Sequence, residues 1–349
     1  MQTQNSSAAS SRRSTANRWP GLLGKYRKAQ PARAAGEVAI TALAFVLCWT
    51  LMLIAVERGL PWLYVLALVP GAGFIVRLFL IQHDCGHGSL FPNQRVNNWI
   101  GRIIGVVTLT PYEYWRRSHA VHHASSGNLD RRGIGDLTTL TVAEYRASSR
   151  WGRIRYWLYR HPVVMFGIGP VYQFVLQHRI PLGFMRDGWW PWLSAIGTNA
   201  AIFGSAAAMI WAVGATTFFM VHVPLVILGS GVGVWLFYIQ HQFEDTHWAD
   251  GKNWSAQEAA LYGSSHYDLP KALRWMTANI GLHHVHHLSS RIPFYRLPEV
   301  LRDHAEFRDL NRITLSESIG ALRLVLWDER VQRLVSFKQL RAEAAGSAA

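Results

Sequence analysis

Histidine is the residue type that dominates the chemistry of this sequence. Three short clusters contain nine of the sixteen histidines and stand just outside long apolar runs. They read His83-Asp-Cys-Gly-His87, His119-Ala-Val-His-His123 and His283-His-Val-His-His287. Residues three and four apart share a helix face, so each cluster can direct two or three imidazoles at one point. Neutral imidazole suits Fe, Zn, Cu and Ni, so the pattern predicts metal without identifying it.

The number of histidines predicts more than one ion. Eight of the nine fit an HxxxH, HxxHH, HxxHH series, and eight imidazoles exceed the ligands that one four- to six-coordinate ion accepts. Two metals are the economical interpretation. The alternative, ordinary core or surface histidines, would explain a single cluster better than three at ligand spacing.

Composition indicates that the elements positioning these clusters lie in a membrane. Of 349 residues, 50% are hydrophobic and only 16% are charged, against about 25% charged in soluble proteins. We predict spans at 38–56, 60–79, 196–213 and 221–238. The fold class is then an all-α integral membrane protein with four transmembrane helices in two hairpins. Each second crossing returns the chain to its starting side, so all three clusters share one face, within a cytosolic helical cap.

Charge sets the predicted orientation. The net charge is +14, and arginines concentrate before the first span, across 95–186 and in the C-terminal third. The two shortest connections between spans are nearly neutral, which fits the positive-inside bias and places the clusters in the cytoplasm. We expect the inner membrane of a bacterium. Nucleic-acid binding is disfavoured because no recognition fold accompanies the positive charge.

The remaining segments divide the chain into three parts. We expect a disordered basic cytosolic tail at 1–37, the membrane domain at 38–335 and a C-terminal tail at 336–349. Within the domain, 99–110 and 163–176 are expected to be interfacial or re-entrant. Leu297 to Phe307 is predicted to form an amphipathic helix. A capping box at Thr314 is predicted to open another helix that continues through Val335.

The sequence around the clusters resembles that of the membrane fatty acid desaturase family, the histidine-box non-haem di-iron enzymes. The similarity covers about residues 35–335. It rests on His83-Asp-Cys-Gly-His-Gly-Ser89, on Trp115-Arg-Arg-Ser-His-Ala-Val-His-His123, and on Asn279-Ile-Gly-Leu-His-His-Val-His-His-Leu288 followed by Arg291-Ile-Pro-Phe-Tyr295. Within the family, the sequence is most similar to the acyl-lipid Δ12 (omega-6) branch.

The resemblance implies which residues bind iron. Box histidines and one further histidine at the end of the fourth span are the expected ligands: His83, His87, His119, His122, His123, His241, His283, His286 and His287. It leaves His284 as a bystander. Asn279, four residues before His283 and on the same expected helix face, could hold a metal-bound water. Asp84 is among the acids that could accept a hydrogen bond from a ligand, together with Glu113, Asp136, Glu244 and Asp245. No catalytic residue separate from the ligands is expected.

The resemblance also implies the reaction. Two irons and O2, with electrons from an external ferredoxin or b5-type donor, would introduce a cis double bond into an acyl chain of a membrane lipid. Hydroxylation or ketolation of a lipid, carotenoid or alkane by the same ligands is the first alternative. A non-enzymatic metal carrier or sensor is the second. An oligomer is compatible with the sequence.

Overall fold

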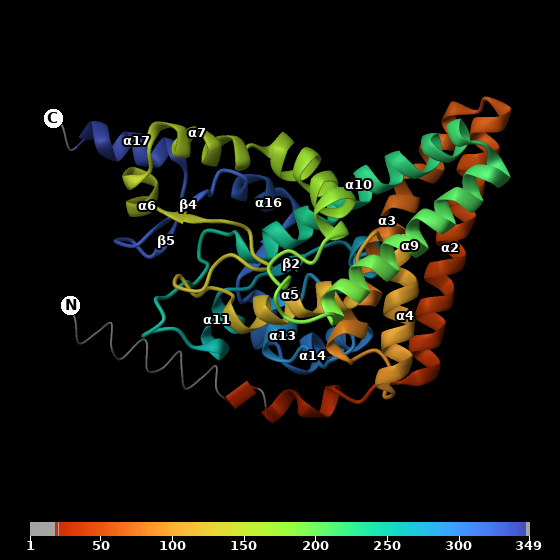
Figure 1. Ribbon diagram of the computed structural model, residues 1–349. Helices are drawn as coiled ribbons and strands as arrows, with labels where there is room; N and C mark the ends of the chain where they lie inside the picture. Colours follow the sequence, from red (N-terminus) through yellow and green to blue (C-terminus); the bar gives the residue numbers. More distant parts are fainter. Residues whose placement is uncertain (1–17, 20, 347–349) are drawn as a thin grey trace.

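The computed structural model describes residues 18–19 and 21–346 and shows a mainly helical protein (Figure 1). In this part of the chain four helices are long and apolar enough to cross a membrane: α2 (Pro31–Arg58), α3 (Pro61–His87), α9 (Trp190–Val213) and α10 (Ala215–His241). Three of the predicted spans each lie inside one of these helices, and the span 60–79 begins one residue before α3, so the two hairpins are confirmed. Gly59, with a φ of 63°, turns the chain from α2 into α3, and Gly214, with a φ of 81°, turns it from α9 into α10.

Two of the long helices extend beyond their predicted spans and carry histidines on the extension. α3 continues to His87, where Gly88 in the left-handed conformation caps it, and α10 continues to His241. Figure 1 shows the turns of both hairpins together at the upper right, with the rest of the chain gathered around the opposite ends. The histidine-bearing ends therefore meet this helical cap.

Close packing between the long helices depends on a small residue. α3 packs against α2, α4 and α10. A Cβ atom added at Gly71 of α3 would lie 2.9 Å from Cδ2 of Leu225 on α10 and 3.2 Å from Cβ of Cys48 on α2. Glycine thus lets three helices approach each other, as small residues do at helix interfaces in membranes.

The segment between the hairpins is made of shorter helices. These are α4 (Gln94–Val107), α5 (Tyr112–Ser125), α6 (Val142–Ala147) and α7 (Arg150–Tyr159). They are followed by π-helical turns at Val164–Ile168 and Tyr172–Leu176, which flank α8 (Gly169–Val171), and by a 3-10 turn at Gln177–Arg179. On α4, Asn97 and Ile104 are buried whereas Trp99 and Ile103 are exposed. This one-sided face on a 14-residue helix fits the predicted interfacial placement better than a span.

The C-terminal part adds short helices and two small sheets to the cap. The helices are α11 (Ala256–Tyr262), α12 (Lys271–Met276), α13 (His283–Leu288), α14 (Leu297–Asp303), α15 (Glu306–Asp309), α16 (Leu315–Ala321) and α17 (Phe337–Gly346), with a 3-10 turn at Phe294–Arg296; another 3-10 turn, at Leu23–Tyr26, precedes α2. Parallel strands β2 (His266–Asp268) and β3 (Arg312–Thr314) form one sheet. In the other, β4 (Leu326–Asp328) lies parallel to β1 (Leu140–Thr141) and antiparallel to β5 (Arg333–Val335).

Two predictions in this region need correction. The predicted helix from Leu297 is interrupted at His304 and continues as the separate α15. The capping box at Thr314 is confirmed, but its helix ends at Ala321 and does not reach Val335. The chain forms β4 and β5 instead; β4 pairs with β1 and with β5, and its Trp327 is completely buried.

The tails also differ from expectation. α2 begins at Pro31, inside the expected disordered tail, and Trp19, Leu23 and Tyr26 are buried against the cap. The Tyr26 hydroxyl donates a hydrogen bond of 2.7 Å to Asp303. These apolar side chains give the basic segment a surface to bury, so 21–37 is ordered, whereas 1–17 and 20 lie outside the described residues. Most of the expected C-terminal tail is α17.

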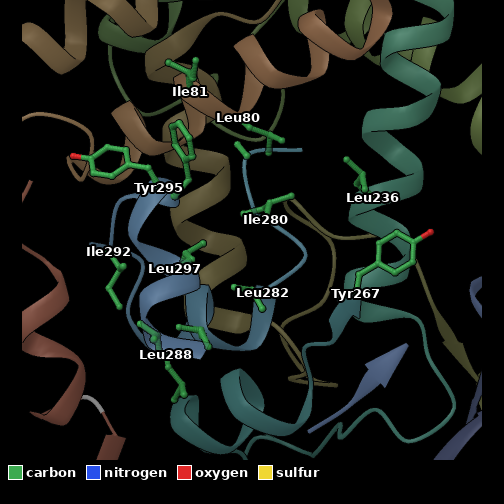
Figure 2. Close-up of a cluster of buried hydrophobic side chains, with 14 of the residues drawn as sticks. Leu80, Ile81, Leu236, Tyr267, Ile280, Leu282, Leu288, Ile292, Tyr295 and Leu297 are labelled. Carbon is green, nitrogen blue, oxygen red and sulfur yellow. The ribbon is translucent and has the colours of Figure 1, made fainter. Parts of the chain in front are cut away.

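A hydrophobic core supports the histidine-bearing segments. Figure 2 shows Leu80 and Ile81 of α3, Leu236 of α10, and side chains between Tyr267 and Leu297 converging on one cluster. Ile280 and Leu282 precede α13 and Leu288 is its last residue; all three belong to this cluster and are buried. The third histidine cluster is thereby held against the ends of α3 and α10.

Candidate metal centre

The structure brings all nine predicted ligands together in two groups. In each group one ring nitrogen from every histidine lies within 4.8 Å of those from the others. Group one has five members and group two has four: His83, His87, His119, His123 and His286 in the first, and His122, His241, His283 and His287 in the second. Each group could hold a metal ion.

The helices explain how the clusters are divided. Two of them, α5 and α13, each contribute to both groups. On α5, His119 and His123 are four residues apart and join group one, whereas His122 is turned to group two. On α13, His283 and His287 join group two, whereas His286 is turned to group one. Both HxxHH motifs therefore span the two groups, while α3 serves group one and α10 serves group two.

Distances within the groups match ligands of a shared ion. In group one, Nε2 of His119 lies 3.0 Å from Nε2 of His87 and 3.1 Å from Nε2 of His123. In group two, Nε2 of His283 lies 3.0 Å from Nε2 of both His241 and His287. Two nitrogens bound at about 2.1 Å to one ion at right angles are about 3.0 Å apart. The nitrogens thus converge as a metal would require.

Burial keeps these imidazoles in the form that binds metal. Burial, and then the proximity of other imidazoles, lowers the pKa of His119, His123, His283, His286 and His287 well below the usual value of 6.5. They are neutral at pH 7, as a ligand must be. Within the described residues, the buried Nε2 of His122 has no hydrogen-bonding partner. An ion in group two would satisfy it, so the residues fit a bound metal.

Two carboxylates lie within hydrogen-bonding distance of histidines in the two groups. Asp84 Oδ1 lies 3.2 Å from Nδ1 of His83, and its Oδ2 accepts a hydrogen bond of 2.7 Å from the backbone N–H of Phe294. Asp136 Oδ1 lies 2.5 Å from Nδ1 of His122. Such contacts fix the tautomer and the orientation of a metal-binding imidazole. His241 uses a backbone carbonyl instead, with Nδ1 3.3 Å from the oxygen of Gly263.

The role of Asp136 depends on its neighbour Gly135. A Cβ atom at Gly135 would lie 2.7 Å from the carbonyl oxygen of Ser118 and 3.1 Å from Cβ of His122, and its φ is 78°. Only glycine lets this loop lie directly against α5. The sequence gives Asp136 as one of several nearby acids; the adjacent Gly135 is the signal that could have singled it out.

Other candidate residues lie elsewhere. The prediction that Asn279 shares a helix face with His283 is wrong, because α13 begins at His283 and Asn279 is in a turn with a φ of 53°. Its amide donates a hydrogen bond of 3.1 Å to the carbonyl of Phe294. His284 is turned away from both groups, with Nε2 3.1 Å from the carbonyl oxygen of Phe307.

Two of the five nearby acids are engaged outside the groups. Glu113 pairs with Arg102 at 2.5 Å and accepts a hydrogen bond of 3.1 Å from Ser194. Glu244 lies 3.9 Å from Arg333. Neither contact brings the carboxylate to a histidine of the two groups.

Comparison with known proteins agrees with this site. The family model described as "Fatty acid desaturase" matches residues 59–318, a range that includes all nine histidines. A protein named "Fatty acid desaturase" from Bacillus subtilis is 42% identical, over 86% of this chain and 85% of its own length. An "sn-1 acyl-lipid omega-3 desaturase (ferredoxin)" from Synechocystis is 29% identical over 63% of this chain and 61% of that protein. An "sn-1 oleoyl-lipid 12-desaturase" from the same organism is 27% identical over 78% and 75%. With two imidazole groups at the ends of two apolar hairpins and these matches across most of its length, the chain belongs to the fatty acid desaturase family of oxidoreductases.

Proposed function

We propose that this protein uses O2 and external electrons to introduce a cis double bond into an acyl chain of a membrane lipid, at the Δ12 (omega-6) position. The observation that carries the proposal is the division of nine histidines, each buried or half-buried, into groups of five and four. Two adjacent groups suit a pair of ions, and imidazole suits iron. Relatives named as 12-desaturases support the position of the bond.

The nine histidines would hold two irons, which supply the oxidising chemistry that amino acid side chains lack for an unactivated methylene. The protein's own contribution is positioning and burial. Asp84 and Asp136 orient His83 and His122. His122, His283 and His286 are almost inaccessible to solvent, so the protein shields this region from water.

The test of the reaction is expression in a bacterial host whose lipids contain monounsaturated acyl chains, followed by fatty-acid analysis. We expect a new 18:2 chain with a cis Δ12 bond. A new double bond elsewhere would overturn the Δ12 assignment and leave the desaturase assignment standing. Hydroxylated or keto products would overturn desaturation.

The test of the ligands is substitution within the groups. His286→Ala removes one nitrogen from group one, and His122→Ala removes one from group two. We expect each variant to lose essentially all desaturation and part of its bound iron, because the ligands act together. The control is His161→Ala, at an exposed position outside both groups. Full activity or full iron content in either ligand variant would contradict the assignment, as would exchangeable zinc or copper without O2 consumption in the wild-type protein.

The proposal includes the location and the electron donor. We place the protein in a bacterial inner membrane with the histidine groups on the cytoplasmic side, where the arginine-rich segments lie. We assign electron delivery to a ferredoxin or b5-type protein. The relative whose name includes "(ferredoxin)" supports the first of these donors.

A further inference from the structure

A cavity of about 490 Å³ lies beside the metal centre, between α2, α3, α12 and α14. Its volume is in the range of protein sites for small ligands, about 300–1,000 Å³. Three arginines line it, one from each of three helices: Arg33 of α2, Arg77 of α3 and Arg302 of α14. None of the nine histidines lines this cavity, so it is a separate feature.

The arginines of the cavity have different roles. Arg77 is completely buried and already engaged, because its guanidinium pairs with Glu37 at 2.5 Å and its Nε donates a hydrogen bond of 3.1 Å to Thr41. Arg33 and Arg302 keep 47% and 70% of their side-chain surface exposed. These two can turn their guanidinium groups toward a ligand.

The charge of the cavity selects the ligand. Three arginines and two glutamates, Glu37 and Glu299, line it, which leaves one net positive charge. The flanking Arg296, 2.7 Å from Glu299, and the flanking Asp303, 3.1 Å from Arg302, add one charge of each sign and keep this balance. Arg33 lies 3.7 Å from Glu299, beyond hydrogen-bonding distance. The net charge of the cavity, one positive charge, fits a ligand with one negative charge.

The cavity lies at the edge of the lipid-facing surface. On α2, the exposed apolar side chains begin with Ile40 and Leu43, about 4.5 and 9 Å along the helix beyond Glu37 at 1.5 Å per residue. Trp275 and Tyr295, which also line the cavity, are the amphipathic aromatic types that favour the headgroup zone. A ligand here would have its polar part in the cavity and any apolar part beside the hydrocarbon layer.

Hydrogen bonds connect the cavity wall to group one. Phe294 lines the cavity, and its backbone N–H donates to Asp84, which contacts His83. Along α3, Arg77 precedes His83 by six residues, about 9 Å at 1.5 Å per residue. One leaflet of the hydrocarbon core is about 15 Å thick, so an acyl chain whose headgroup lies in the cavity is long enough to cover this distance to the histidines.

We propose that this cavity binds the phosphodiester of a glycerophospholipid whose acyl chain is the substrate. The proposal rests on the proposed function and adds the carrier of the acyl chain. Arg33 and Arg302 bind the phosphate oxygens, because the guanidinium fork matches phosphate geometry. A phosphodiester carries one negative charge and complements the cavity. Coenzyme A carries several phosphate charges, and a galactolipid headgroup carries none.

The binding test uses the metal-free full-length protein, delipidated in detergent, and native mass spectrometry with dioleoylphosphatidylglycerol or a dioleoyl galactolipid. We expect the phospholipid to bind more tightly than the galactolipid. The double variant Arg33→Gln/Arg302→Gln should lose affinity for the phospholipid on the order of tenfold. The control Arg58→Gln, at the opposite end of α2, should bind like the wild type. Equal binding of the two lipids, or unchanged binding by the double variant, would overturn the proposal.

The kinetic test separates this inference from the proposed function. With phosphatidylglycerol as substrate, the double variant should show a KM raised on the order of tenfold with little change in kcat, since the groups that hold iron are untouched. If the wild type desaturates the lipid and the double variant does so with an unchanged KM, the headgroup site is overturned and the desaturase assignment stands. Headgroup binding without any new double bond in the wild type would overturn both the proposed function and the substrate assignment.

Discussion

Asp136 is the residue whose removal should affect metal binding without removing a ligand. Its carboxylate lies 2.5 Å from Nδ1 of His122. Asp136→Asn keeps the size of the side chain but removes the negative charge that makes this imidazole a stronger ligand. We expect iron affinity to fall about 10- to 100-fold, measured by metal titration of the metal-free protein. The control is Asp187→Asn, at an exposed position. Affinity equal to that of the wild type would show that the carboxylate does not support His122.

His178 should make stability depend on pH. Burial, followed by the charge of Arg179, lowers the pKa of His178 from 6.5 to about 3. The unfolded chain binds a proton on His178 more readily than the folded protein does. The stability that neutral His178 allows is therefore fully present above pH 6.5, and it is lost as the pH falls toward 3. Between pH 7 and 5 the loss is about 2 kcal/mol. His178→Phe should reduce the pH dependence of the unfolding free energy by that amount, measured by chemical denaturation in detergent. A pH dependence equal to that of the wild type would contradict this, and His161→Phe, at an exposed position, is the control.

At the scale of elements, Gly101 fixes how α4 packs on α5. A Cβ atom at Gly101 would lie 2.3 Å from the ring of Tyr112, whose hydroxyl donates a hydrogen bond of 2.8 Å to the carbonyl of Cys85, between His83 and His87. Gly101→Ala should therefore destabilise the protein by about 1–3 kcal/mol through overpacking. The control Gly204→Ala on α9 meets no atom within 4 Å and should be neutral or stabilising, because alanine favours helix. Thermal unfolding in detergent measures both. An unchanged midpoint for Gly101→Ala would contradict the packing argument.

The arrangement of the helices and strands explains which features could be predicted from the sequence and which could not. The long helices and the nine histidines follow from apolar run length and from spacing along one helix, which are local properties. The division of each HxxHH between the two groups depends on how α5 and α13 cross α3 and α10, which spacing does not specify. The strand β4 was missed because it pairs with β1, which is far away in the chain, and β5 was missed with it because β5 pairs with β4. Asp136 reaches His122 only because the loop at Gly135 packs against α5.

At the scale of the whole molecule, charge distribution should govern the supply of electrons. The chain has 35 basic and 21 acidic residues, and the proposed topology places most of the arginines on the side of the metal centre. A positive face attracts an acidic donor over long range, and salt screens this attraction. We expect turnover with an acidic reduced ferredoxin at limiting concentration to fall several-fold between about 0.02 and 0.2 M salt. Turnover with a small chemical reductant should change little. Arg291→Glu, exposed and four residues after His287, should slow the reaction with ferredoxin. Arg58→Glu, at the hairpin-turn end of α2, should not. A rate that is independent of salt, or equal effects of the two reversals, would show that the basic face does not guide the donor.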